Sequence, residues 1–289
     1  MVPVFDDLLA KGVKICSFVA DNENVMNKLG NLLVEKYDFL IRVPCTAHVI
    51  QLVVHKALKL NSIKWIIQTA VSIVKEYDTN KRLRNKLKQV QDDHQRKRLI
   101  KPNATRWSSE LLACQRLLQL KQYIQALTPQ TNQFWRHLEY LCEFLEPFQK
   151  ATDVIQQDRS SLVDVYHQFI KLLQHCASLA QHELLSKPAA NTKRIINKYW
   201  NSTIKKEAVI ASAILGMEST DMFSDIDIFH AHEFIVEHGA KYVTYYKIGK
   251  SSGDADSVTE ALNGQLHVNC LSSLVVVVFL KAVRPNQQV

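Results

Sequence analysis

Residues 14–60 decide the fold class, and they read KICSFVADNENVMNKLGNLLVEKYDFLIRVPCTAHVIQLVVHKALKL. Residues 14–20 are a short apolar run that ends at a carboxylate, and residues 39–43 are a second run that ends at a proline. Both are typical of buried strands. Residues 24–35 and 46–60 carry apolar side chains at helical spacing. The order strand, helix, strand, helix predicts an α/β domain whose strands lie in a covered sheet.

Beyond this region the pattern is helical until a polar segment near the C-terminus. Amphipathic stretches are predicted at residues 63–93 with a break near Tyr77, 108–127 with Ser108 as N-cap, 134–157 with Pro147 kinking or splitting the helix, 162–185 and 191–215. Residues 247–256 are glycine- and serine-containing and resemble a linker. An isolated strand-like run follows at residues 271–280, with no helical pattern around it.

Polar residues follow each of the two predicted strands. Asp21 stands where metal-dependent phosphoryl-transfer folds place a carboxylate for Mg²⁺, although the same residue could cap the helix that begins near Asn24. Cys45 and His48 form a C-x-x-H pair, which is half of a zinc site. The nearest further ligand is His55, and no second pair is found. We therefore expect a core-facing thiol and a histidine that caps the strand-to-helix turn, without structural zinc.

A basic tract in the middle of the chain predicts contact with phosphates. Between Lys56 and Glu110 there are 14 Lys and Arg against 5 Asp and Glu, an excess of 9 that exceeds the net charge of +8 of the whole chain. On helices these residues could track a nucleic-acid backbone, or they could simply be a solvated face. The candidate phosphate ligands are Lys81, Arg82, Arg84, Lys86 and Lys88, followed by Arg96, Lys97 and Arg98.

Arg106 and Trp107 stand together just before a predicted helix. An arginine can bind a phosphate there, and a tryptophan can stack on a base. The alternative is a tryptophan that anchors the loop in the core, with the arginine paired to a carboxylate.

Export or membrane insertion is not indicated. The first ten residues lack a basic region followed by an apolar core, and the apolar run at residues 274–280 is far short of a membrane span. The six cysteines are scattered without a C-x-x-C pair, so we expect reduced, mostly buried thiols in an intracellular protein.

Taken in order, these elements resemble the hobo/Activator-type (hAT) DNA transposases over roughly residues 11–220. The similar segments are VADN, VPCTAHVIQLVV, IKPNATRWSSELLACQRLL, FWRHLEYLCEFLEPFQKATDVIQQDRSSLVDVYHQF and NKYWNSTIKKEAVIASAIL. The resemblance implies a partial α/β ribonuclease-H-like core with a large all-α insertion, predominantly helical overall. It implies domains at residues 1–125 for the ribonuclease-H-like region, 126–246 for the helical insertion, and 247–289 for a linker and a divergent or truncated tail.

The resemblance also implies roles for particular residues. In the family two Asp and one Glu bind divalent metal ions, and Asp21 matches the second acidic position. Cys45, His48, Arg106 and Trp107 match other marked residues, expected near the active site and the DNA bases. A first Asp and a third Glu are not recognised in their usual contexts, and the family's L-D-P element is replaced by Leu-Gly-Met at residues 215–217. No N-terminal zinc finger is recognised.

The leading interpretation is a transposase-derived, nuclear, DNA-binding protein that lacks a complete catalytic triad. Mg²⁺ or Mn²⁺ would bind only at a complete site, and a homo-oligomer is expected only if a further C-terminal region exists. One alternative is an active transposase completed by Asp7 and by Glu233 or Glu260. Another is a helical protein-interaction scaffold whose basic surface meets an acidic partner.

Overall fold

The chain folds into two units, one built around a small sheet and one in which every described element is a helix. The structure is a computed structural model that describes residues 2–13, 15–21, 23–91, 96–103, 107–204, 206–216, 223–248 and 277–279. The sheet unit comprises Met1–His48, Asp158–His167 and Tyr199–Val289, and the helical unit comprises Val49–Gln157 and Gln168–Lys198. The sheet unit is therefore interrupted in sequence by the helical unit.

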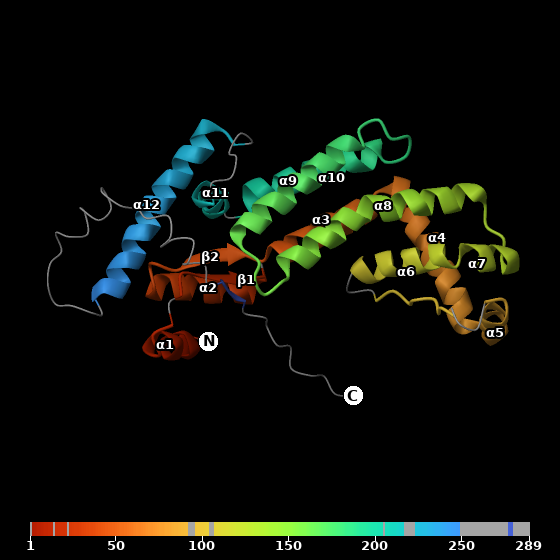
Figure 1. The fold of residues 1–289 in the computed structure, drawn as a ribbon, viewed down its shortest axis with the longest axis horizontal. Coiled ribbons are helices and arrows are strands. Elements are labelled where there is room, and N and C mark those ends of the chain that lie inside the picture. The colour runs from red at the N-terminus through yellow and green to blue at the C-terminus, as the bar shows by residue number, and fades with distance from the viewer. Residues whose placement is uncertain are drawn as a thin grey trace. The chain divides into compact units, whose positions relative to one another are not determined.

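A three-stranded parallel sheet organises the sheet unit (Figure 1). Strand β1 (Ser17–Ala20) lies between β2 (Ile41–Pro44) and β3 (Val277–Phe279). Parallel strands are covered on both faces, which explains why β1 is a continuous apolar run. The two strands predicted from residues 14–20 and 39–43 are confirmed. The run at residues 271–280 is not isolated, because its described part is the third strand of the sheet.

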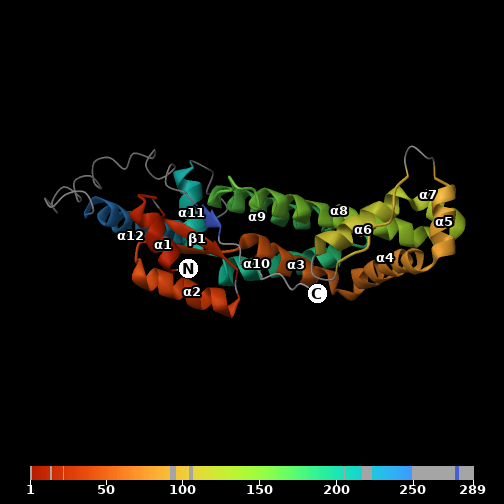
Figure 2. The same ribbon diagram turned by 90° about the horizontal axis from the view of Figure 1, so that it is seen from below.

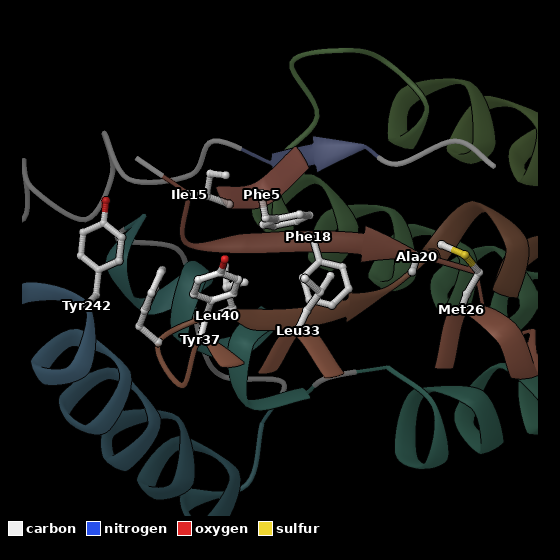
Figure 3. Close-up of a cluster of buried hydrophobic side chains, with 10 residues drawn as sticks. Phe5, Ile15, Phe18, Ala20, Met26, Leu33, Tyr37, Leu40 and Tyr242 are labelled. Carbon is white, nitrogen blue, oxygen red and sulfur yellow. The ribbon is translucent and has the colours of Figure 1, made fainter. Parts of the chain in front are cut away.

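Aromatic side chains fill the core of the sheet unit (Figure 3). Phe18 on β1 is 1% exposed, and its ring meets that of Phe5 edge-on at a centroid distance of 6.1 Å. Phe5 belongs to α1 (Val2–Ala10), and Leu33 of α2 (Asn24–Lys36) is buried in the same cluster. Burying one such side chain stabilises the fold by about 1.5–3 kcal/mol.

Two later helices complete the sheet unit. Helices α11 (Lys206–Leu215) and α12 (Asp225–Ile248) pack on each other, with Ala211 and Ala231 buried between them. Tyr242 of α12 also belongs to the sheet core, where its ring lies 6.2 Å from that of Phe39. Residues more than two hundred positions apart therefore share one core.

The described elements of the helical unit are helices, which Figure 2 shows from below. Helices α4, α6 and α8 contact one another, and Trp135, Leu138 and Phe144 of α8 are fully buried. The helices from α3 to α10 span Thr46–Leu58, Asn61–Thr79, Lys81–Gln89, Trp107–Gln119, Lys121–Leu127, Asn132–Ile155, Leu162–Ser178 and Ser186–Ser202. The expected predominance of helix is confirmed, whereas the ribonuclease-H-like core stays a prediction.

Several helix ends differ from the sequence expectations. The 63–93 stretch is divided at Asn80, whose side chain accepts a hydrogen bond from the N–H of Leu83 at 3.1 Å. Ser108 is not an N-cap, because α6 already begins at Trp107. Pro147 does not split its helix, since α8 continues through it. Of the described helices, none is both long enough and apolar enough to cross a bilayer.

Candidate nucleic-acid interface

The carboxyl ends of β1 and β2 bring Asp21 and Cys45 together. Ala20 pairs with Pro44 in the parallel register, and the N–H of Cys45 donates to the carbonyl oxygen of Ala20 at 2.7 Å. The charge of Asp21 acts on the Cys45 thiol. The two residues therefore lie side by side at one edge of the sheet, as strand ends in an α/β fold do.

The thiol of Cys45 caps helix α3. It accepts hydrogen bonds from the backbone N–H groups of His48 and Ala47, which have no partner within the first helical turn. Burial raises the pKa of this thiol, and the nearby Asp21 adds to the rise, so the group is a neutral cap. The cysteine thus caps this turn, and the capping role expected for the ring of His48, which is half-buried, stays a prediction.

Asp21 has a local structural partner. Its Oδ1 accepts a hydrogen bond from the N–H of Glu23 at 3.2 Å, which closes the turn that leads into α2. Glu23, not Asp21, is the N-cap residue of that helix. Within the described residues no three His, Cys, Asp or Glu side chains gather closely enough to hold a metal ion. The metal-binding role of Asp21 stays a prediction.

The structure describes only one residue of the Arg106–Trp107 pair. Arg106 lies outside the described residues. Trp107 is the first residue of α6 and is 3% exposed, so its ring packs in the helical unit and is not presented to a base. This position favours the interpretation in which the tryptophan anchors the loop.

Helix α5 carries a high density of positive charge, which lowers the intrinsic stability of the helix. Its nine residues, KRLRNKLKQ, include five cations and no acid. Lys81 and Arg82 stand in the first turn, where the helix dipole disfavours cations, and α5 itself contains no carboxylate that could offset them. Leu83 and Leu87, one turn apart, supply its apolar contact. A sequence that breaks these local rules is expected at a functional surface more than at an ordinary solvated face.

A groove of about 400 Å³ runs beside α5. Its other walls are the end of α4 and the extended segment 96–103, which we call the strap. Among the residues that the structure describes, Asp78 is the one acid that lines it, and its carboxylate pairs with Lys101 Nζ at 3.2 Å. The cations that line it are Lys81, Arg84 and Lys88 from α5 and Lys97, Arg98 and Lys101 from the strap. Six cations and one paired acid make this a strongly positive concavity.

The groove divides the candidate phosphate ligands into two sets. Lys81, Arg84 and Lys88 line it, whereas Arg82 and Lys86 are exposed on α5 outside it. The sequence analysis did not single out Lys101, which stands alone between Ile100 and Pro102. In the groove it pairs with Asp78, which lies 23 residues earlier and gives no local signal.

A comparison with protein families relates this region to a known domain. Residues 43–144 match the family described as the ZBED1 RNase-like helical domain, a domain found in hAT-derived ZBED proteins. The whole groove lies within the matched segment, as do Cys45, His48 and Trp107. Asp21 lies before it. No curated protein sequence matches the chain.

Proposed function

We propose that the chain is a transposase-derived, hAT-related protein that binds nucleic acid through the groove beside α5. The observation that carries this proposal is the convergence of six cations with one acid, itself paired, in a single concavity. Nucleic acids are the partners whose dense negative charge such a surface fits, and each neutralised phosphate releases counterions. The match at residues 43–144 supports a transposase origin.

The finer parts of the proposal follow from the hAT resemblance. Residues around β1, β2 and α3 would belong to a partial ribonuclease-H-like core, interrupted by helices. DNA would be the partner and the nucleus the location. His48, with Cys45 beside it, would lie near the bound DNA. Asp21 would bind Mg²⁺ or Mn²⁺ only in a chain that supplied the other two carboxylates.

Removing two groove cations is expected to weaken binding about tenfold at 0.1 M salt and to lower the salt slope by about 2. The variant is Lys81→Gln/Arg84→Gln, and the measurement is fluorescence anisotropy with a labelled duplex over a range of salt concentrations. The matched control is Arg82→Gln/Lys86→Gln, which removes one lysine and one arginine from the same helix outside the groove. We expect the control to lose less than threefold.

Two outcomes would contradict this assignment. Equal losses in both variants would mean that the overall charge of α5, and not the groove, attracts the nucleic acid. Undetectable or salt-insensitive binding by the unmodified chain would favour the protein-interaction scaffold, whose acidic partner would then occupy the groove.

Binding is expected without strand cleavage. Catalysis by two metal ions needs carboxylates on both sides of the ion pair, and Asp21 is the one family position recognised in the sequence. The test incubates the protein with Mg²⁺ or Mn²⁺ and end-labelled duplex DNA, beside an Asp21→Ala variant. We expect no nicking by either protein. Nicking that disappears in the variant would show that Asp21 belongs to a complete site.

A further inference from the structure

The strap belongs to no helix or sheet, so its backbone groups bond to side chains or to water. Residues 96–103 have neither helical nor strand structure. A backbone segment of this kind keeps one conformation only where fixed groups accept and donate its hydrogen bonds. The positions of its three groove cations, Lys97, Arg98 and Lys101, therefore depend on the hydrogen bonds that fix the strap.

Gln91 links the beginning of the strap to α5. Its side chain is 6% exposed and lies just beyond the end of α5. Nε2 donates to the carbonyl oxygen of Leu87 at 2.9 Å, and Oε1 accepts from the N–H of Lys97 at 2.9 Å. One buried carboxamide thus joins the last turn of α5 to the beginning of the strap.

Helix α6 holds the strap at two more points. Arg116 donates from Nη1 to the carbonyl oxygen of Arg98 at 2.8 Å. At the far end, Ser109 Oγ accepts from the N–H of Asn103 at 2.7 Å and donates to its carbonyl oxygen at 2.9 Å. The strap is therefore fixed at its beginning, middle and end by residues that do not themselves line the groove, apart from Gln91.

We propose that the groove is a two-walled clamp for one phosphodiester strand and that Gln91 is the positioning residue of its second wall, an inference that rests on the proposed function. The first wall is the row Lys81, Arg84 and Lys88, which recurs at helical spacing on one face of α5. The second wall is the strap. Because Gln91 fixes the backbone at the beginning of the strap before the ligand arrives, binding costs less backbone ordering than it would with a loose segment. Gln91 itself contributes no charge.

The test replaces Gln91 with methionine, which keeps the length of the side chain and the net charge but removes both hydrogen bonds. We expect affinity for nucleic acid to fall about three- to tenfold and the salt slope to fall by about 1–2, as strap contacts with phosphates are lost. Trypsin should cut faster after Arg96, Lys97 and Arg98, whereas the helical circular dichroism should be preserved. Single-stranded and duplex oligonucleotides of one sequence are compared, and both should bind more weakly.

Gln89→Met is the matched control, because Gln89 is an exposed glutamine on the same helix and does not line the groove. It should leave affinity, salt slope and trypsin cleavage unchanged. Ser109→Ala loosens the other end of the strap without a change in charge, and it should reproduce the losses in affinity and slope. This second variant tests the clamp even if Gln91→Met does not fold.

The failures of the two proposals are distinguishable. If the unmodified chain does not bind nucleic acid, the proposed function is wrong and the clamp falls with it. If the unmodified chain binds and both strap variants bind equally well with the same salt slope, the clamp alone is wrong. A loss confined to duplex would also overturn the clamp, because the strap would then face a second strand.

Discussion

Replacing Phe18 with alanine is expected to lower the free energy of unfolding of the sheet unit by about 3–5 kcal/mol. Phe18 lies on the middle strand of the sheet, is 1% exposed, and packs edge-on against Phe5. Alanine would leave a cavity that neighbouring strands fill poorly, since both are hydrogen-bonded to β1. The measurement is urea unfolding followed by circular dichroism, with hydrogen exchange used to locate the loss.

The loss of stability should depend on the volume of the side chain that replaces Phe18. Phe18→Leu keeps most of the buried volume and should cost less than about 1.5 kcal/mol. Hydrogen exchange should accelerate in β1 and α2 more than in α8, which belongs to the helical unit. A loss below 1 kcal/mol for Phe18→Ala would contradict the central place of this residue in the core.

A second substitution is expected to change stability by a similar amount but to stabilise the protein. Replacing Pro147 with alanine is expected to raise the free energy of unfolding by about 2–3 kcal/mol, because proline inside a helix costs roughly 3 kcal/mol relative to alanine. Helix α8 runs from Asn132 to Ile155 without interruption, so Pro147 stands well within it. Alanine would supply the N–H that the carbonyl group of Glu143 lacks. Differential scanning calorimetry measures the change in Tm.

Pro188 offers a matched control for Pro147. It is the third residue of α10 and is buried. In the first turn a proline lacks only an N–H that has no helical partner, so alanine there gains no hydrogen bond and loses buried surface. Pro188→Ala should therefore destabilise by about 1 kcal/mol. A lowered Tm for Pro147→Ala would mean that the packing of α8 depends on the proline.

Local signals account for what the sequence predicts well. Helix α2 begins at Asn24 as expected and ends one residue beyond the predicted end. The apolar spacing and the polar residues that mark its ends are all local in sequence, so they predict it well. The strands were recognisable as apolar runs beside turn residues. Helix α1 was not recognised, although the Asp6 carboxylate that accepts from Lys36 at 2.7 Å fastens it to α2. That contact joins residues thirty positions apart and leaves no local pattern.

The two walls of the groove also differ in how much of them the sequence predicts. The charge of α5 is visible in sequence as a run of lysine and arginine. The charges of the strap at Arg96, Lys97 and Arg98 are visible as well, but its position beside α5 is not. That position depends on hydrogen bonds to Gln91, Arg116 and Ser109, and such polar residues give no sign of their partners in the sequence. The capping thiol of Cys45 shows a related limit. A C-x-x-H spacing suggests metal binding, whereas the structure shows the sulfur turned to backbone N–H groups.

The interruption of the sheet unit sets an order of folding during synthesis. The helical unit ends at Lys198, so all its residues are translated before α11 and α12. Its contacts are mostly between helices close in sequence, which form quickly. The first 48 residues must wait for Tyr242 and its neighbours before their own core is complete. The earliest part of the chain to be made is thus the last to be finished, and its apolar strands lack their full core in the interval.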